Sequence, residues 1–90
     1  MTPPTRWRLE TDARFDRELR KLDRVTQQRI LAYLVDVAAL DDPRQRGKGL
    51  TAQRSGQWRY RIGDDRVIVL LDDARLIVVA LTVGHRSSVY

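Results

Sequence analysis

Two arginines on one predicted strand offer the clearest chemistry in this sequence. Arg59 and Arg61 are two residues apart, so on a strand their side chains leave the same face about 7 Å apart, close to the phosphate spacing of a nucleic-acid strand. Arg66 opens the next predicted strand just past a tight turn, and it can lie on or beside that face. The arrangement suits phosphate binding. The alternative is that these cations are simply the solvated face of a strand.

The C-terminal residues add groups that can transfer protons. His85, Arg86 and Tyr90 follow the last predicted strand at an end of the same sheet. RNA cleavage needs a base for the 2′-hydroxyl, positive charge for the phosphorane and an acid for the leaving 5′-oxygen. Arginine supplies the charge, and histidine or tyrosine can supply the other two. A strand-end cap for His85 and packing of Tyr90 on the sheet are the structural alternatives.

The positive charge is concentrated in one part of the chain. The formal net charge is +5, and residues 44–66 carry seven cations against two anions, whereas the rest of the chain is balanced. Such a local excess favours an anionic partner over a general role in solubility. The candidate RNA contacts outside the strands are Arg44, Arg46, Lys48 and Arg54.

The composition excludes several classes of protein. A length of 90 residues predicts a single domain, 1–90. With no cysteine and one histidine, a disulfide scaffold, a thiolate-bound cluster and an imidazole zinc site are excluded, and we expect no metal and no cofactor. No apolar run is long enough for a membrane helix and the first residues lack a signal-peptide pattern, so we expect a cytoplasmic protein without membrane contact.

The first half of the chain predicts a short strand and two helices. Trp7 and Leu9 alternate with polar residues, as in a half-buried strand. Thr11 or Asp12 caps the first helix and Asp23 caps the second, which ends near residue 40 ahead of a proline. The short link between them predicts an antiparallel helix hairpin. The expected core positions on these helices are Phe15, Leu19, Leu22, Val25, Ile30, Leu31, Leu34, Val37 and Ala38.

The second half predicts a long polar loop followed by a sheet. Three strands separated by tight turns form an antiparallel meander, which makes the fold class α+β. The helices should cover one sheet face, the one that holds Trp58 and Tyr60, and leave the arginines on the other face. The predicted ranges are 41–56 for the loop and 58–62, 66–72 and 75–83 for the strands.

Two longer motifs resemble the RelE branch of the RelE/ParE toxin superfamily. One is Gly49-Leu50 followed by GQWRYRIGDDRVI at residues 56–68, and the other is VGHRSSVY at residues 83–90. The likeness extends over nearly the whole chain. It implies a RelE-like fold of the microbial ribonuclease type.

The resemblance also implies a function and its partners. RelE-like members are toxins of type II toxin–antitoxin systems that cleave mRNA in the ribosomal A site and inhibit translation. They act without metal, by a 2′-hydroxyl attack that leaves a 2′,3′-cyclic phosphate. The implied partners are a cognate antitoxin, the ribosome and mRNA, with operator DNA bound only through the antitoxin complex.

Residue by residue, the resemblance implies roles for the arginines and the tail. Arg66 and Arg86 would hold and neutralise the scissile phosphate, and Tyr90 would stack on a base or assist proton transfer. Two lysines of better-known members are replaced here by arginines, which keep the charge but cannot act as a general base. His85 therefore becomes a candidate acid or base. The implied catalytic set is Arg59, Arg61, Arg66, His85, Arg86 and Tyr90.

Two other functions fit parts of the same sequence. ParE-like toxins resemble this fold but inhibit DNA gyrase and lack the RNA-cutting residues. The other hypothesis is a catalytically inactive module that binds RNA or an antitoxin. This last alternative predicts uniformly weakened binding on loss of phosphate contacts and no cleavage under any condition.

Overall fold

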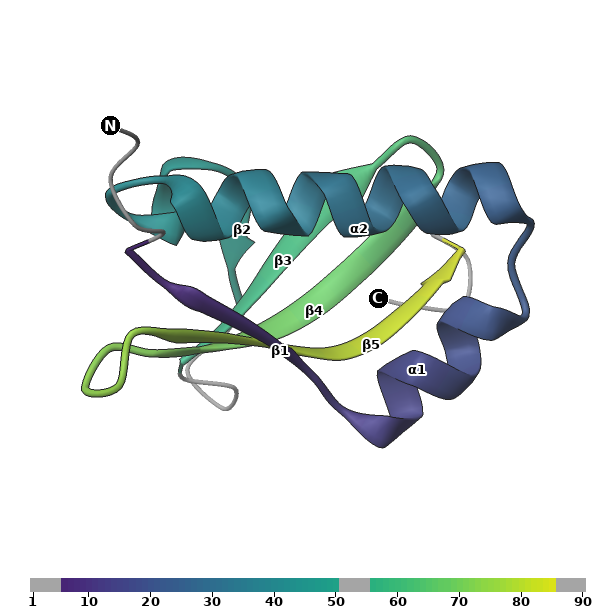
Figure 1. The fold of residues 1–90 in the computed structure, drawn as a ribbon. Coiled ribbons are helices and arrows are strands. Elements are labelled where there is room, and N and C mark those ends of the chain that lie inside the picture. The colour runs from purple at the N-terminus through teal and green to yellow at the C-terminus, as the bar shows by residue number, and fades with distance from the viewer. Residues whose placement is uncertain (1–5, 51–55, 86–90) are drawn as a thin grey trace, which may run out of the picture.

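A twisted five-stranded sheet with two helices forms the fold (Figure 1). The computed structural model describes residues 6–50 and 56–85. The strand order is β1-β5-β4-β3-β2, with β1 parallel to β5 and the other neighbours antiparallel, which confirms the predicted α+β class. The elements in chain order are β1 (Arg8–Thr11), α1 (Ala13–Arg20), α2 (Arg24–Ala39), the 3₁₀ turn η1 (Pro43–Gln45), β2 (Lys48–Gly49), β3 (Gln57–Ile62), β4 (Asp65–Asp72) and β5 (Ile77–His85).

Aspartate caps start both helices, as the sequence predicts. The side chain of Asp12 accepts a hydrogen bond from the Arg14 amide at 2.7 Å, and that of Asp23 accepts one from the Thr26 amide at 3.1 Å. Each bond satisfies an amide that has no partner inside the helix. Leu40 is extended directly after α2, which therefore ends where the sequence predicted.

The helices pack on the sheet over a single cluster of buried residues. Phe15 of α1, Ile30 and Leu34 of α2, and Tyr60 of β3 are all fully buried in this cluster. The expected core positions were wrong at Val25 and Leu31, which are 64% and 37% exposed. Both lie off the stripe of α2 that faces the sheet, because each residue turns the helix by about 100°.

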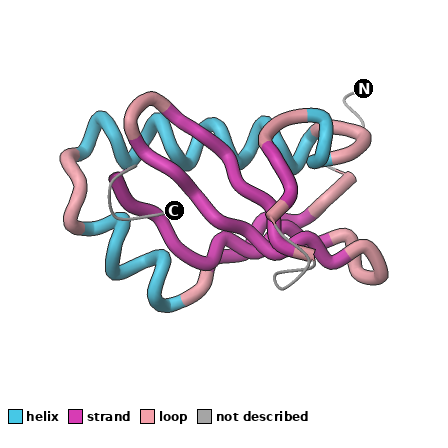
Figure 2. The backbone as a smooth tube through the Cα atoms, turned by 180° about the vertical axis from the view of Figure 1, so that it is seen from behind, coloured by secondary structure: helices cyan, strands magenta, loops and turns pink. Residues whose placement is uncertain are grey.

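The two helices of the predicted hairpin diverge and pack on different strands. Although a short link joins the helices, α1 packs beside β5, whereas α2 packs against β1, β3 and η1 (Figure 1). Figure 2 shows the molecule from behind, with the strands lying in front of α2. The helices therefore share one side of the sheet, and the described residues place no helix across its other face.

Helix α1 also protects the free edge of β5. Strand β1 pairs with β5 only as far as Ala80. Beyond that point the carboxylate of Glu18 accepts hydrogen bonds from the Thr82 hydroxyl and, at 3.1 Å, from the Val83 amide. Burial acts to raise the pKa of Glu18, but these hydrogen bonds outweigh it and leave the pKa lowered. An exposed strand edge is thus covered by a side chain.

The loop predicted over residues 41–56 contains two elements that the sequence did not indicate. These are the turn η1 and the two-residue strand β2, which pairs antiparallel with Trp58 and Arg59. Both are held by contacts to β3: the Trp58 indole donates to the carbonyl of Arg46, and the Tyr60 hydroxyl donates to that of Pro43 at 2.7 Å. Because the residues that make these contacts are far apart in the sequence, no local sequence pattern predicts them.

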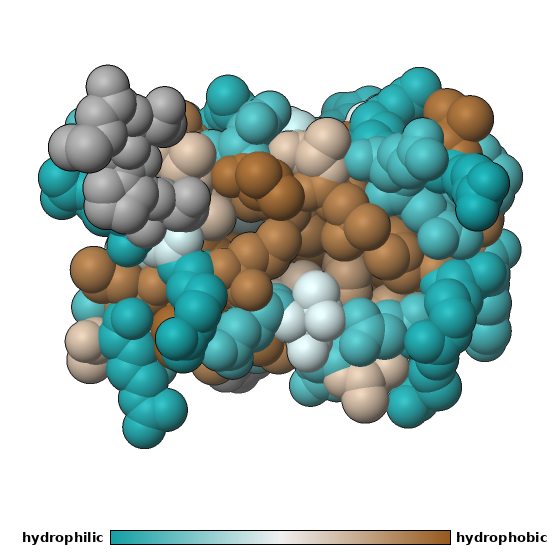
Figure 3. Space-filling model, viewed as in Figure 1, coloured by the Kyte–Doolittle hydropathy of each residue, from teal (hydrophilic) through white to brown (hydrophobic). Residues whose placement is uncertain are grey.

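The surface has an apolar hollow on the helix side. Figure 3 shows hydrophobic surface running below α2, and a hollow of about 250 Å³ opens between α2 and β1. The residues that line this hollow are Trp7, Arg8, Leu9, Val35 and Ala38.

Neither of the described α-helices is long and apolar enough to cross a membrane.

Candidate functional site

Four cations are placed opposite one another by the strand register. Arg61 of β3 lies directly across from Arg66 of β4, and Arg59 of β3 lies directly across from Lys48 of β2. The fully buried Tyr60 between the two β3 arginines points to the other face, so Arg59 and Arg61 share the face predicted for them. Like charges directly opposite each other destabilise a sheet. The molecule holds two such pairs side by side.

These cations line a pocket with a volume of about 450 Å³. It lies at the β2 edge of the sheet, where a residue of α2 and a glycine complete its walls. None of the described residues that line it is acidic. Arg59, Arg61 and Arg66, which the sequence placed on or beside one strand face, therefore lie together in one cationic pocket. The lining residues are Tyr33, Gly47, Lys48, Arg59, Arg61 and Arg66.

The pocket wall depends on a glycine that the sequence analysis did not single out. Gly47 has a φ of +78°, and a Cβ there would collide with the carbonyl of Arg59 and crowd the rings of Trp58 and Tyr60. The loop therefore approaches β3 as closely as only a glycine permits. This approach brings the next residue, Lys48, into register with Arg59.

The four pocket cations form no ion pair with any described residue, whereas several arginines elsewhere do. The shortest of those ion pairs joins Arg44 to Asp73 at 2.7 Å. The described carboxylates that form ion pairs thus pair with arginines outside the pocket. The other described pairs are Arg6–Asp41, Arg8–Glu10, Arg14–Glu18, Arg44–Asp42 and Arg75–Asp72.

Arg44, one of the candidate RNA contacts, is held in ion pairs by two aspartates. Its guanidinium donates to both oxygens of Asp73, at 3.0 and 2.7 Å, and joins η1 to the turn between β4 and β5. The hydrogen bond from Arg44 lowers the pKa of Asp73, and the same bond raises the pKa of Arg44. The guanidinium of Arg44 therefore carries a structural ion pair, and its contact with RNA stays a prediction.

The remaining predicted site residues are distributed unevenly. Arg46 lies over the ring of Tyr33, 5.3 Å from its centroid, beside the pocket. His85 pairs with Asp65, whereas Arg66 pairs with Gly84. Because neighbouring strand residues face opposite sides of the sheet, His85 lies on the other face from Arg66 and is not among the described residues that line the pocket. Three predicted residues, Arg54, Arg86 and Tyr90, lie outside the described residues.

The pocket can bind an anion and stabilise negative charge that develops on it. Its guanidinium groups match phosphate oxygens in charge and geometry. Arginine stays protonated in proteins and cannot act as an acid or a base. Among the described lining residues, only Tyr33 and Lys48 therefore carry a side chain that can exchange a proton. No three His, Cys, Asp or Glu side chains gather as a metal site within residues 6–50 and 56–85.

Comparison with known proteins decides the family. The family model of the ParE toxin of type II toxin–antitoxin systems matches residues 9–90. The chain belongs to the RelE/ParE toxin superfamily. This toxin is also similar to Toxin RelG of Mycobacterium tuberculosis, with 37% identity over 86 residues that cover 92% of each protein. The resemblance stated from the sequence is confirmed.

Solved structures are similar over most of the toxin. The RelBE2 toxin–antitoxin complex of M. tuberculosis contains a chain that is 30% identical with a TM-score of 0.68, covering 97% of this toxin and 99% of that chain. A double-arginine mutant of E. coli toxin RelE in the free state has a TM-score of 0.77 at 22% identity, covering 92% and 86%. At that identity the likeness concerns the fold alone.

Proposed function

We propose that this toxin is an endoribonuclease that cleaves mRNA in the ribosomal A site and so inhibits translation. The observation that carries the proposal is the two pairs of opposed like charges, Arg61 with Arg66 and Lys48 with Arg59, around a pocket without described carboxylates. Such an arrangement lowers stability in the free protein and is relieved by a bound polyanion. The phosphate backbone of RNA supplies that charge.

The cleavage that we propose is an internal transfer at phosphorus. The ribose 2′-oxygen loses its proton and attacks the adjacent phosphate, the bond to the 5′-oxygen breaks, and that oxygen takes up a proton. A 2′,3′-cyclic phosphate and a 5′-hydroxyl result, without a metal or a cofactor. Arg61 and Arg66 neutralise the extra charge on the phosphorane, which is the largest electrostatic demand of the reaction.

The proton transfers fall to the groups around the pocket and to the C-terminal signature. Arg59, Arg61 and Arg66 stay charged and serve only to bind and stabilise. His85 and Tyr90 remain our candidates for acid and base, with Arg86 as a further phosphate contact, as the family resemblance implies. Lys48 in the pocket and Arg54, which lies outside the described residues, remain our candidates for further RNA contacts.

We also propose that a cognate antitoxin neutralises this toxin and links it to operator DNA. The RelBE2 chain and the RelE chains of E. coli and Pyrococcus horikoshii are seen in complexes with their antitoxins, which supports a similar partner here. An acidic antitoxin segment would complement the same cations that bind RNA. Action on the ribosome implies a cytoplasmic location.

Primer extension on a reporter mRNA after brief induction tests the proposal. We expect discrete cuts inside translated codons that disappear when initiation is blocked. They should also disappear in the double variant Arg61→Ala, Arg66→Ala. The control variant Arg8→Ala, Arg75→Ala makes the same change of charge at two exposed, ion-paired positions and should cut normally. Intact mRNA during growth arrest would contradict the proposal.

Gyrase inhibition is the second candidate, because the matching family model is that of the ParE toxin. It predicts growth arrest with DNA damage, intact reporter mRNA and inhibition of supercoiling by purified gyrase. An inactive binding module predicts neither cuts nor arrest. The same induction experiment, with a supercoiling assay beside it, separates the three functions.

A further inference from the structure

The pocket has one aromatic wall, which the phosphate-binding role does not explain. Tyr33 is the only uncharged side chain among the described lining residues, and it comes from α2 whereas the cations come from β2, β3 and β4. It is half-buried. An aromatic ring beside a row of phosphate-binding cations is a combination typical of sites that bind single-stranded nucleic acid.

The ring of Tyr33 rests on a rigid support. It packs on Tyr60 with centroids 5.7 Å apart and ring planes at 58°. Tyr60 is fully buried and is fixed through its hydroxyl to the carbonyl of Pro43. The position of Tyr33 is thus set before any ligand arrives, so binding costs little side-chain ordering.

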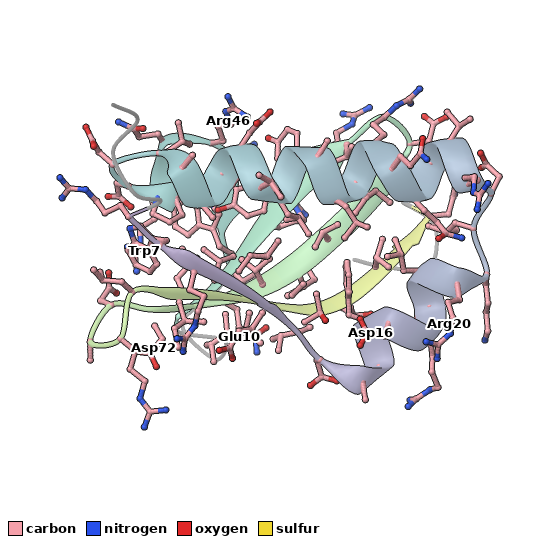
Figure 4. The ribbon with its side chains drawn as sticks, viewed as in Figure 1. Trp7, Glu10, Asp16, Arg20, Arg46 and Asp72 are labelled. Atoms are coloured by element: carbon pink, nitrogen blue, oxygen red, sulfur yellow. The ribbon has the colours of Figure 1, made fainter. Side chains whose placement is uncertain are left out.

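Arg46 adds a second planar group on top of this ring. Its guanidinium carbon lies 5.3 Å from the Tyr33 centroid, and its side chain is exposed beside α2 (Figure 4). No described carboxylate pairs with it. Arg46 directly precedes Gly47, so the stacked pair stands at the rim of the pocket.

The loop does not need this stacked pair for its own structure. Its backbone is already anchored by the Trp58 indole at the carbonyl of Arg46, by the Tyr60 hydroxyl at Pro43 and by Arg44 at Asp73. The side chain of Arg46 takes part in none of these contacts. Its exposed planar face is therefore available for a ligand.

We propose that Arg46 and Tyr33 form a stacking platform for the nucleobase next to the phosphate held by Arg59, Arg61 and Arg66. Guanidinium planes and aromatic rings both stack on unpaired bases, whatever their identity. The platform would splay one nucleotide out of the strand and thereby fix the phosphate in the pocket. This inference rests on the proposed RNA substrate and adds a base-binding subsite to it.

Binding of a short fluorescent RNA to the full-length toxin tests the platform. The probe is a single-stranded RNA with 2′-O-methyl riboses, which prevent cleavage, and one 2-aminopurine, whose emission falls when it stacks. We expect the toxin to quench this emission. Arg46→Lys keeps the charge but loses the plane, so it should weaken binding about tenfold and abolish the quenching.

A matched pair at the second position checks the ring itself. Tyr33→Phe keeps the ring and should bind and quench as the wild type does, whereas Tyr33→Leu should behave like Arg46→Lys. Equal thermal unfolding of Arg46→Lys and the wild type shows that the exposed substitution leaves the fold intact. Normal quenching by both Arg46→Lys and Tyr33→Leu would overturn the platform.

Arg61→Ala separates failure of the platform from failure of the proposed function. If Arg61→Ala weakens binding while Arg46→Lys and Tyr33→Leu do not, the RNA site stands and the platform is wrong. If Arg61→Ala binds the probe as tightly as the wild type, the proposed phosphate site itself is wrong, and the platform falls with it.

Discussion

Arginines in two regions of this toxin are used in opposite ways. Around η1, α1 and the β4–β5 turn, arginines face carboxylates, as in the pairs Arg44–Asp73 at 2.7 Å and Arg14–Glu18 at 3.5 Å. Around the pocket, cations face other cations across the strands. Apart from Lys48 the residue type is the same in both regions, and the strand register and the placement of the acidic residues differ.

The difference teaches that charge composition alone does not identify a site. Paired surface arginines contribute little to stability, about 0–1 kcal/mol each, and they leave no charge for a ligand. Opposed cations lower stability and persist where function requires them. The unneutralised cluster of Lys48, Arg59, Arg61 and Arg66 is therefore the informative feature.

The largest effect that we expect comes from removing one pocket cation. Arg66→Ala should lower the single-turnover rate of mRNA cleavage on programmed ribosomes about 100- to 1000-fold, because a charge that stabilises the transition state is lost. Arg75→Ala, which removes an arginine paired with Asp72, should leave the rate unchanged. Equal rates in the two variants would remove the distinction between the two regions.

A somewhat smaller effect should follow from disturbing the pocket wall. Gly47→Ala and Gly56→Ala both place a side chain at positive φ, which costs about 1–2 kcal/mol. Only Gly47→Ala also collides with backbone, at Arg59, whereas a Cβ at Gly56 meets Leu70 at 3.5 Å. Urea unfolding should therefore show an additional loss of about 1–3 kcal/mol for Gly47→Ala. Equal losses would mean that the close approach is unimportant.

Reversing one charge should separate stability from activity. Arg61→Glu places a carboxylate opposite Arg66, so unfolding should cost about 0.5–1 kcal/mol more than in the wild type while RNA cleavage disappears. Arg75→Glu makes the same charge change next to Asp72 and should give no such gain. Urea unfolding checks both variants. A stability loss in Arg61→Glu would contradict the opposed-cation account.

The smallest effect that we expect is on the pH dependence of stability, through Glu18, which pairs with Arg14. The pKa of Glu18 is lowered in the folded protein from its usual 4.5, so its contribution to stability is present above pH 4.5 and is lost as pH falls through the folded-state pKa. In Glu18→Gln, the free energy of unfolding should fall less steeply toward acid pH, by less than about 1 kcal/mol compared with the wild type. Urea midpoints measured from pH 7 down to about pH 3 check it, and an unchanged acid limb would exclude the linkage.

The fold was predictable where local signals decide it. Asp12 and Asp23 cap helices through their own side chains, and the meander follows from alternation and turn residues. The turn η1 and strand β2 were not predictable, because Trp58 and Tyr60 hold them from a distant part of the chain. Long-range contacts leave no local pattern to interpret.

The site was predictable in part for the same reason. Arg59, Arg61 and Arg66 lie in adjacent strands joined by a two-residue turn, so their convergence follows from the sequence. Tyr33 reaches the pocket from α2, and its proximity depends on how the helix crosses the sheet. The ion pair that occupies Arg44 depends on Asp73, which lies 29 residues away in the chain.

The salt dependence of RNA binding tests the central claim most directly. The logarithm of the affinity for a single-stranded RNA falls with the logarithm of the salt concentration, with a slope of about 0.7 for each phosphate contact. With an uncleavable RNA, we predict that Arg61→Ala lowers this slope by about 0.7 relative to the wild type, whereas Arg75→Ala leaves it unchanged. The same slope for all three proteins would contradict the assignment of the unpaired cations to RNA phosphates.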